Sequence, residues 1–570
     1  MFIFNLLFVL LFGSSVPVSY CNQPESINDQ SSQKSMVSIY QIDPLEKILL
    51  EQNSFTDNQD TIRVARGEVA TVQLLVMGFN EIANPQMNVR VFSEKNMTNE
   101  LKGEINRVGY VGATNKFEKP SSVILSSTAN KYPDVLFPLG EQGYDYEKNQ
   151  PFWISIPIPE NIAPGIYKGR FTLGGQIDNN DTVLKKSFVI RVYPPVINKT
   201  SLLVSNWNYF DSRILAYMNN GVNVKKYSVL YWDLVKQFAE VAGEYKFNVH
   251  FINPVEETSY KIENGRYGFD FSNFDKQINF FQKEGTIARI EGGHVAIRSG
   301  NWESPFLVKV PEITNETTTI RYLPMNDSRV SDFYSQFLPA LKEHLIEKGW
   351  YNIYMQHIAD EPISDNADSY KQISKMIRMY MADAKIIEAT YAAEELSSYI
   401  DIWTPILGVF HNSYPYFEDL INKGTEVWFY TCTGPQGDYA NRFIQLPLIQ
   451  PRLLHWINFK YNSVGYLHWA TNHWLSATNP YKETTNLKEG WNGGDAFVLY
   501  PGYRKLYSSI RLHAIRDGIT DYELLKMLKE KNATKAKELT DEVVLSFDRY
   551  NNSVEHFRGI RKVLLEELSK

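Results

Sequence analysis

The first third of the chain alternates apolar and polar residues over short stretches. Runs of this kind occupy residues 71–76, 152–156 and 187–192, and turn residues separate them. Because successive side chains of a strand point to opposite faces of a sheet, the pattern predicts strands without intervening helices. We therefore expect an antiparallel β-sandwich over residues 36–196. The Tyr-Pro-Pro sequence at 193–195 ends it, because proline cannot continue a central strand.

Beyond residue 197 short apolar runs alternate with helical stripes. One stripe places Phe337, Leu341 and Leu345 at helical spacing and stops at Gly349. Eight apolar runs are candidate strands: 202–207, 248–252, 287–290, 351–358, 386–390, 402–405, 427–431 and 464–469. Eight strands alternating with helices predict a (β/α)8 barrel over residues 197–525. An open, doubly wound sheet is the alternative, although no glycine-rich phosphate loop follows the first strand.

Apolar stripes predict that the chain ends in helices over residues 526–570. One of them runs through Val554 and Phe557. These helices either close the ring around the barrel or form a small appendage. On the preceding helix, Arg516 and Asp521 have the charge and place expected of structural ion-pair partners that anchor this tail to the barrel.

The amino terminus has the pattern of a secretory signal. Residues 2–12 are almost continuously apolar, and they are too few for a permanent membrane anchor. We expect a signal peptide over residues 1–21, an unstructured linker over 22–35, and export to the periplasm or the cell surface. Cys21 stands where a lipoprotein carries its acylated cysteine, although Tyr20 is bulkier than such signals prefer. No later segment offers about 18 uninterrupted apolar residues, so no membrane span is predicted.

Composition argues against several classes of function. With 58 basic and 65 acidic residues, the 570-residue chain has a net charge of −7, which argues against a nucleic-acid partner. Its two cysteines exclude a multi-thiolate metal site, and Cys432 lacks the partner motif of a cysteine nucleophile. His468 and His473 are five residues apart, which does not put two ligands on one helical face. We therefore predict no metal and no cofactor. Aromatic residues, at 14%, would supply the flat rings of a sugar-binding cleft.

The most informative sequence lies at the end of the fourth predicted strand, where Asp360, Glu361 and Pro362 follow one another. Active sites of (β/α)8 barrels lie at the carboxyl ends of the strands. Ordinary retaining glycosidases use two carboxylates about 5 Å apart, on opposite sides of the sugar. Adjacent acids better suit substrate assistance, in which the 2-acetamido group of the sugar is the nucleophile. We assign Glu361 as general acid/base and Asp360 as the carboxylate that orients the acetamido N–H. The alternative is that they are ordinary loop acids, or a charge at the start of the helix that follows.

These acids belong to a wider set of motifs. Three segments together resemble glycoside hydrolase family 123: 357–362, 493–502 and 509–523. The resemblance implies a β-sandwich in front of a (β/α)8 catalytic domain, β-N-acetylgalactosaminidase activity, an oxazolinium intermediate and retention of configuration. It maps the acidic pair of the family onto Asp360 and Glu361. His513 departs from the pattern, which has an acid at this place.

Further side chains near the predicted strand ends are candidates for binding the sugar. Tyr391 and Tyr430 could hold the acetamido carbonyl by donating a hydroxyl proton. Asp495 is a candidate ligand of sugar hydroxyls, including the axial O4 of galacto sugars, and His294 is another hydroxyl ligand. Four tryptophans could stack on the ring or wall the acetamido pocket: Trp428, Trp469, Trp474 and Trp491. Packing in the core is the competing explanation for each tryptophan, and a turn is the competing explanation for Asp495.

The leading interpretation is an exo-acting, retaining glycoside hydrolase that removes terminal β-linked N-acetylgalactosamine. The expected partner is then a glycan with that terminus. A β-N-acetylglucosaminidase or a broad hexosaminidase would use the same acids and differ in its contacts to O4. A non-catalytic glycan-binding protein of the cell surface is the other alternative, and the intact acidic pair argues against it.

Overall fold

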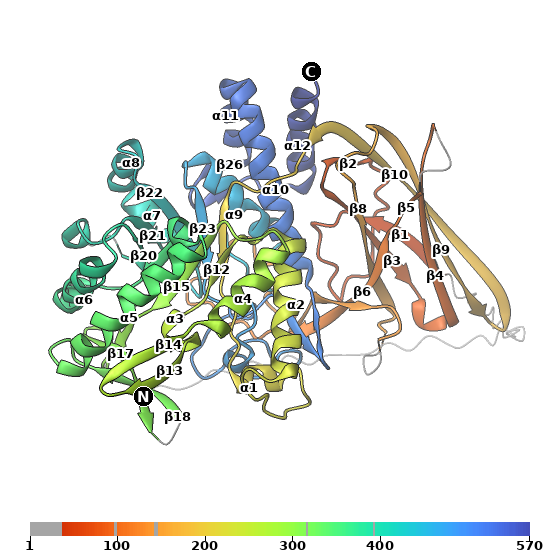
Figure 1. Cartoon of the computed structure of the whole chain (residues 1–570). Coiled ribbons are helices and arrows are strands. Elements are labelled where there is room, and N and C mark those ends of the chain that lie inside the picture. Colours follow the sequence, from red (N-terminus) through yellow and green to blue (C-terminus); the bar gives the residue numbers. More distant parts are fainter. Residues whose placement is uncertain (1–36, 96–99, 142–145, 315–316, 392–393) are drawn as a thin grey trace, which may run out of the picture. The chain divides into compact units, whose positions relative to one another are not determined.

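The computed structural model describes residues 37–95, 100–141, 146–314, 317–391 and 394–570. The predicted signal peptide, the predicted linker and Cys21 lie outside them. Figure 1 shows a sandwich of strands in the amino-terminal part and, after it, a barrel with helices around it. Among the described residues, no helix is long and apolar enough to cross a membrane.

Two five-stranded sheets form the sandwich. One has the order β1 (Ser38–Ile42), β3 (Val69–Met77), β8 (Asn149–Pro157), β6 (Glu104–Gly112) and β7 (Lys131–Pro138). The other has the order β2 (Ile62–Arg66), β10 (Asn180–Val196), β9 (Gly165–Ile177), β4 (Ala83–Ser93) and β5 (Glu100–Leu101). Neighbouring strands run antiparallel, except that β2 and β10 are parallel. The predicted alternation is confirmed, because Val72, Leu74 and Val76 contribute every second side chain of β3 to the core between the sheets.

Eight parallel strands close the barrel in chain order. They are β11 (Leu203–Asn206), β12 (Val249–Phe251), β15 (Arg289–His294), β19 (Tyr354–His357), β20 (Lys385–Thr390), β21 (Ile402–Pro405), β22 (Glu426–Thr431) and β23 (Gly465–His468). Each lies within or overlaps one of the eight predicted runs. The last strand pairs with the first, with Leu203 opposite Gly465, so the barrel is closed and the open sheet is excluded.

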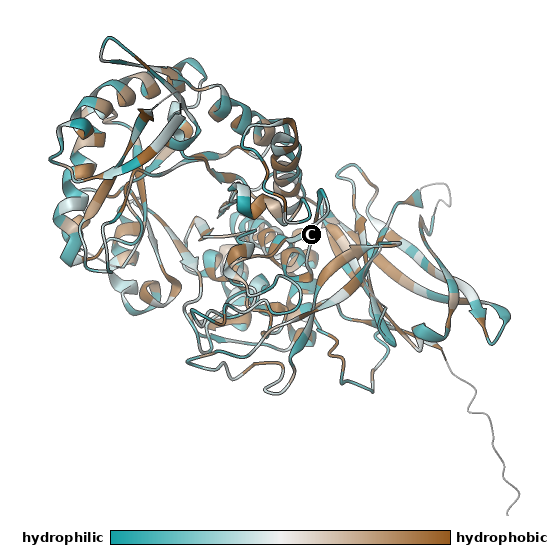
Figure 2. Ribbon diagram, turned by 90° about the horizontal axis from the view of Figure 1, so that it is seen from below, coloured by the Kyte–Doolittle hydropathy of each residue, from teal (hydrophilic) through white to brown (hydrophobic). Residues whose placement is uncertain are grey.

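Helices connect the strands and cover the outside of the barrel. They are α1 (Ser212–Ala216), α2 (Val229–Tyr245), α3 (Pro254–Glu257), α4 (Ser272–Lys283), α5 (Ser328–Glu347), α6 (Ala367–Tyr380), α7 (Leu407–Asn412), α8 (Tyr414–Asn422), α9 (Ile449–Lys460) and α10 (Ile510–Lys531). Their bands of hydrophobic and hydrophilic colour in Figure 2 are those of helices that bury one face. As predicted, α5 buries Phe337, Leu341 and Leu345, and Gly349 follows it in the left-handed conformation. Short 3-10 helices occupy Phe79–Glu81, Tyr351–Ile353, Ser364–Asn366, Glu394–Leu396 and Trp474–Ser476.

Small sheets interrupt this alternation. Between β12 and α4 lies the hairpin β13 (Ser259–Glu263) and β14 (Arg266–Asp270), and a further pair is β24 (Tyr500–Gly502) and β25 (Lys505–Tyr507). Between β15 and α5 lies a three-stranded sheet of β16 (Ala296–Arg298), β17 (Phe306–Thr314) and β18 (Thr317–Leu323). The sequence analysis did not predict this three-stranded sheet. It follows directly on the carboxyl end of β15, which is the active-site end of the barrel.

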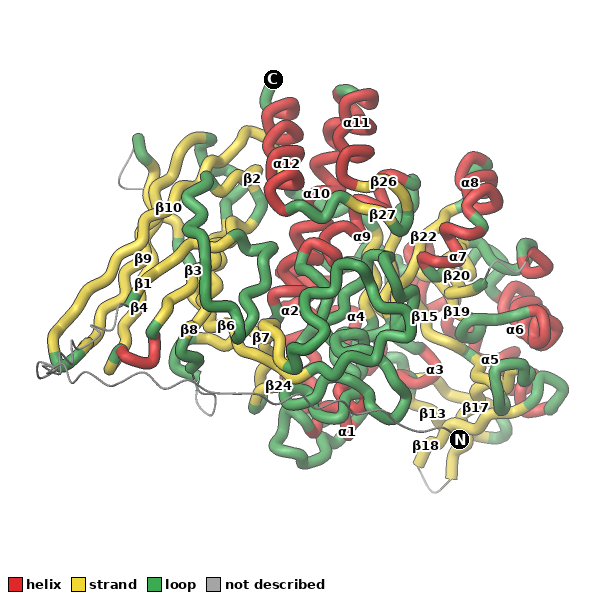
Figure 3. Tube along the Cα trace, turned by 180° about the vertical axis from the view of Figure 1, so that it is seen from behind, coloured by secondary structure: helices red, strands yellow, loops and turns green. Residues whose placement is uncertain are grey.

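The tail contains α11 (Ala533–Val543), β26 (Val544–Ser546), β27 (Arg549–Tyr550) and α12 (Val554–Leu568). The predicted boundary between residues 525 and 526 falls inside α10, because the apolar stripe of that helix continues without a break to Leu528. Figure 3 shows α12 beside β2 and β10 of the sandwich. The tail therefore packs against the sandwich as well as against the barrel helices.

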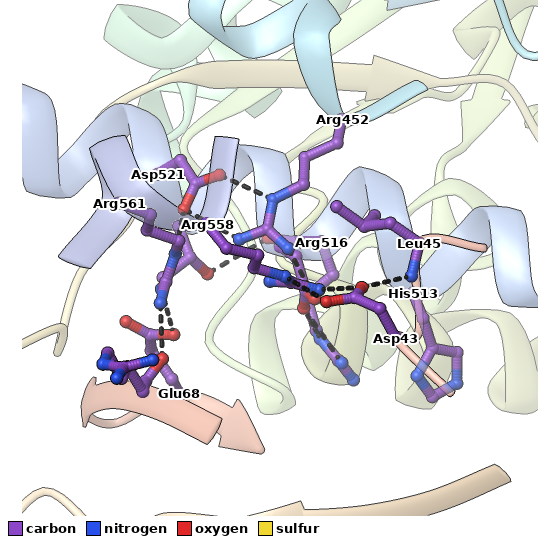
Figure 4. Close-up of polar contacts among 12 residues, drawn as sticks. Asp43, Leu45, Glu68, Arg452, His513, Arg516, Asp521, Arg558 and Arg561 are labelled. Carbon is purple, nitrogen blue, oxygen red and sulfur yellow. Dashed lines mark hydrogen bonds and ion pairs between the residues drawn. The ribbon is translucent and has the colours of Figure 1, made fainter. Parts of the chain in front are cut away.

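Buried ion pairs connect the sandwich, the barrel and the tail (Figure 4). Asp521 of α10 accepts hydrogen bonds from Arg452 Nε of α9 at 2.6 Å and from Arg561 Nε of α12 at 2.8 Å. Arg561 also pairs with Glu68 of the sandwich at 2.5 Å. Burial by itself would raise the pKa of Asp521, but Arg452 and Arg561 outweigh it and lower the pKa to about 2. The anchoring role predicted for Asp521 is confirmed.

A neighbouring pair has the same arrangement. Arg558 of α12 donates to both carboxylate oxygens of Asp43 in the segment after β1, at 2.8 and 2.9 Å. Arg516, for which we predicted the same role, pairs with the adjacent Asp517 at 3.1 Å, and among the described residues it makes no ion pair with another element.

We expect the substitution Asp521→Asn to lower the free energy of unfolding by about 3–5 kcal/mol, because it leaves two buried guanidinium groups without their shared charge. Denaturation in urea at pH 7 measures the change. Asp419→Asn is the control. The Asp419 side chain pairs with Lys423 but is 57% exposed, so we expect the free energy of unfolding to change by less than about 1 kcal/mol. Equal effects of the two substitutions would contradict this role of Asp521.

Candidate active site

The chain leaves β19 in an unusual backbone conformation. The strand ends at His357, and Glu361 has a φ of 47°, in the left-handed region that residues with a side chain rarely adopt. Consecutive side chains of an extended strand point to opposite faces, so Asp360 and Glu361 could not share a cleft if the strand continued. The left-handed residue ends the extended conformation, and Pro362 follows it. Arg298 secures the turn by donating a hydrogen bond to the carbonyl oxygen of Glu361.

The two adjacent carboxyl groups have different surroundings. Burial and the charge of Asp360 raise the pKa of Glu361 to about 7, and a hydrogen bond from Tyr430 and the charge of Arg298 oppose this only in part. Loss of solvation by burial also raises the pKa of Asp360, although the positive charges of Arg298 and His357 oppose this. However, 56% of the Asp360 side chain is accessible to water, so it is the better solvated of the two. Glu361 is therefore the group that keeps its proton near neutral pH.

A fully buried chain of hydrogen bonds lies beneath this pair. His357 contacts Glu388 through Nδ1 at 2.8 Å and Glu291 through Nε2 at 2.5 Å. Burial would lower the pKa of His357, but the two carboxylates outweigh it and raise the pKa to about 10, so the ring is an imidazolium. Glu388 Oε2 also accepts the backbone N–H groups of Ile358 at 2.9 Å and Ala359 at 3.2 Å. The same carboxylate thus neutralises the buried imidazolium and holds the backbone that leads to Asp360 and Glu361.

His294 lies at the end of β15, beside both carboxylates. Its Nε2 is 3.9 Å from Asp360 Oδ1 and 3.8 Å from Glu388 Oε1. Burial and the charge of His357 lower its pKa well below the ordinary value, so the ring is neutral. Within the described part of the chain, His294, His357 and Glu388 are the group that could hold a metal ion. An ion there would have to displace a hydrogen bond of His357, and the absence of a metal stays a prediction.

Tyr430 and Tyr391 lie on the Glu361 side of the site. Tyr430, on β22, donates its hydroxyl proton to Glu361. Tyr391 directly follows β20 and is 37% exposed; burial and the charge of Glu361 raise its pKa to about 12. Both hydroxyl groups therefore keep their protons at neutral pH and can donate to a ligand.

An aromatic wall lies at the end of β23. Trp469 donates its indole N–H to Asp495 Oδ2 at 3.0 Å and contacts Trp491 edge-on, with ring centroids 5.9 Å apart. Burial raises the pKa of Asp495 to about 7 against the charge of Arg442. Tyr209 makes a second edge contact with Trp469, at 6.2 Å. Asp495 is only 2% exposed, so it orients the wall from behind.

Trp428 and Trp474 correct the sequence expectation, because neither ring has an exposed face. Trp428 lies inside the barrel against the backbone of Gly465, and its indole N–H bonds to Glu426 at the opposite end of β22 from Tyr430. Trp474 is buried in the main core and donates to the carbonyl oxygen of Leu499 at 2.8 Å. For these two tryptophans the competing explanation, core packing, is the right one.

Glu291 and Glu388 beneath the acidic pair were not predicted from the sequence, and neither were three residues around it: Tyr209, Arg298 and Trp302. Burial and the charges of Asp360 and Asp495 raise the pKa of Tyr209, which shows that it lies near both acids. Its position three residues after β11 was a usable signal, because loops after barrel strands form the active site. Arg298 ends β16 and Trp302 lies in the loop between β16 and β17, and no sequence motif marked them.

Comparison with known proteins agrees with this architecture. Residues 207–528 match the catalytic domain of glycoside hydrolase 123, and residues 49–175 match the glycoside hydrolase 123 N-terminal domain. The chain belongs to glycoside hydrolase family 123. It is therefore a glycosidase in class, and the predicted resemblance and fold are confirmed.

A solved family 123 structure has the same fold over nearly the whole chain. It is a family 123 glycoside hydrolase from Clostridium perfringens, with 18% identity and a TM-score of 0.67, covering 94% of this chain and 97% of that one. A β-D-glucuronidase from Dictyoglomus thermophilum has 10% identity and a TM-score of only 0.31, with 85% and 68% of the two chains covered. No curated protein matches the chain.

We expect His357 to be doubly protonated at pH 8 and to become neutral in the variant Glu388→Gln. The introduced amide still accepts the two backbone N–H groups but turns its NH2 towards Nδ1, which must then give up its proton. The ring ¹⁵N shifts of labelled histidine report the change. His250, whose pKa burial lowers to about 3, is the internal reference that stays neutral in both proteins. A neutral His357 ring in the unsubstituted protein would contradict this account.

Proposed function

We propose that this family 123 enzyme is an exo-acting, retaining β-N-acetylgalactosaminidase that works by substrate-assisted catalysis. The observation that carries the proposal is the adjacent pair at the end of β19, in which Glu361 retains a proton and Asp360 beside it is the better solvated carboxylate. One proton donor and one anion next to it are what a 2-acetamido sugar needs from its enzyme. The nucleophile is then already part of the substrate.

The proposed reaction has two steps. First, the acetamido carbonyl oxygen attacks the anomeric carbon while Glu361 gives its proton to the glycosidic oxygen, which leaves with the bonding electrons. Asp360 accepts a hydrogen bond from the acetamido N–H and stabilises the positive charge of the oxazolinium ion. Second, Glu361 takes a proton from a water molecule while the oxygen of that water attacks the anomeric carbon. The bond between the anomeric carbon and the acetamido oxygen then breaks, which opens the oxazolinium ring. Two inversions give overall retention.

Other buried acids of the described barrel are poorly suited to be a separate nucleophile. Glu291 and Glu388 are engaged by His357, and Glu388 also by two backbone N–H groups. Asp495 has a pKa of about 7, so much of it is protonated at neutral pH, and its Oδ2 accepts the indole N–H of Trp469. This distribution favours attack by the substrate's own amide.

The remaining site residues fit the proposed sugar. A hydroxyl proton of Tyr391 or Tyr430 would hold the acetamido carbonyl in the attacking position. Trp469 and Trp491 would pack against the apolar side of the pyranose, and Asp495, which is buried behind them, would act on the O4 side of the sugar through Trp469. His294 would contact a ring hydroxyl as a neutral imidazole.

The natural substrate and the compartment are part of the proposal. The Clostridium perfringens relative is described for glycolipid glycan hydrolysis, so glycolipid glycans with a terminal β-linked N-acetylgalactosamine are the first substrates to test. We propose that the protein acts after export, on the basis of its amino-terminal sequence. Preference for aryl β-N-acetylglucosaminide over aryl β-N-acetylgalactosaminide would assign the rival hexosaminidase activity instead.

We expect Glu361→Gln to abolish turnover of glycosides with poor leaving groups and to reduce that of activated aryl glycosides much less, because activated aglycones need little proton donation. For the unsubstituted enzyme, kcat/KM should fall as the pH rises through about 7, since Glu361 must be protonated. With activated substrates, kcat/KM of Glu361→Gln should not fall as the pH rises through about 7. Equal rates for both proteins on poor leaving groups would contradict the assignment of Glu361.

We expect a β-galactoside with a 2-hydroxyl group to be cleaved at least about 1,000-fold more slowly than the matching 2-acetamido sugar, because it lacks the internal nucleophile. The comparison uses the same aryl aglycone and measures kcat/KM for both. Comparable rates would contradict substrate assistance while leaving glycosidase activity intact.

A further inference from the structure

Trp302 is held firmly although it is largely exposed. It lies between β16 and β17, and 42% of its surface is accessible. The guanidinium carbon of Arg298 lies 3.9 Å from the centre of its ring. Arg298 Nε and Asn366 Nδ2 also donate to the backbone carbonyl of Trp302, both at 3.1 Å. One face of the indole is thus covered by the cation, and the backbone beneath it is tied down.

Trp302 also lies close to the general acid. Arg298, which stacks on its ring, donates to the carbonyl oxygen of Glu361. On another side, the ring of Tyr391 meets Trp302 edge-on at 6.2 Å and 79°, and Tyr391 is close enough to Glu361 for the carboxylate to raise its pKa. Two independent contacts therefore connect Trp302 to Glu361.

Core packing does not account for such a residue. Exposure alone would need no explanation, but the position of this ring is fixed by Arg298 and by the anchored backbone, which removes the entropy that a mobile side chain would lose on binding. A rigid, exposed aromatic face beside a catalytic acid is a preformed contact surface. Its open side is flat and apolar, which matches the C–H face of a pyranose.

We propose that the open face of Trp302 binds the leaving group of the substrate, and that this leaving group is itself a pyranose. The inference rests on the proposed function, because the general acid must touch the glycosidic oxygen and the group beyond that oxygen must then lie on the Glu361 side. Arg298 connects this binding face to the general acid. Its guanidinium group stacks on the Trp302 ring, and it also donates a hydrogen bond to the carbonyl oxygen of Glu361. The enzyme thus selects the sugar beyond the cleaved bond as well as the terminal one.

Two substrates separate this role from a general effect on the acid. One is a disaccharide with N-acetylgalactosamine β-linked to methyl galactoside, and the other is the trifluoroethyl β-glycoside of N-acetylgalactosamine, whose aglycone has no ring. We expect Trp302→Ala to lower kcat/KM about 10-fold for the disaccharide and less than about 2-fold for the trifluoroethyl glycoside. Trp302→Phe should restore most of the loss. Tyr322→Ala, in the same three-stranded sheet and 43% exposed, is the matched control and should change neither value.

Each other outcome has a definite meaning. An unchanged kcat/KM for the disaccharide with Trp302→Ala would overturn the proposal. Equal losses on both substrates would also overturn it, because Trp302 would then act through Glu361 and not on the leaving sugar. If the unsubstituted enzyme cleaved neither substrate, the proposed function would be wrong. The proposed binding of the leaving group by Trp302 would then be wrong as well.

Discussion

A buried charge inside the barrel is the constraint on which the active site depends. His357 is an imidazolium between Glu291 and Glu388, and all three side chains are fully buried. Such charges are tolerated only when each has a partner, because burial removes the solvation that water provides. Here the partner of the imidazolium also binds the backbone of Ile358 and Ala359. One carboxylate therefore both compensates the charge and positions the backbone that leads to Asp360 and Glu361.

The difference in protonation between Asp360 and Glu361 arises from their surroundings and not from their chemistry. They are neighbours in the chain, but the left-handed conformation of Glu361 turns it towards Tyr430, while Asp360 stays open to water. The charge of Asp360 in turn keeps the proton on Glu361. Arg298 restrains this turn from the three-stranded sheet, so a small addition to the barrel influences the site as strongly as the strands themselves.

Much of the fold could be predicted because it depends on local patterns. Alternation with a period of two identified strands β3, β8 and β10 of the sandwich, and apolar runs between helical stripes identified all eight barrel strands. The rule that barrel active sites lie at strand ends then placed Asp360 and Glu361 correctly at the end of β19. The predicted boundary at residue 525 lies inside α10, because the helix continues to Lys531 and its buried residues extend to Leu528.

The sequence by itself determined the order of the elements and favoured a closed barrel over an open sheet. It also identified Asp360 and Glu361 as the acidic pair, since all of these follow from neighbours along the chain. Only the tertiary structure decided which side chains join the pair. Trp428 and Trp469 both lie on or just past barrel strands, yet one ring is sealed inside the barrel and the other is half-buried beside Asp495. Arg298 meets Glu361 across about sixty residues of chain, and Trp302 packs its ring against Arg298. No local pattern encodes such contacts, because they depend on where strand ends and loops converge in space.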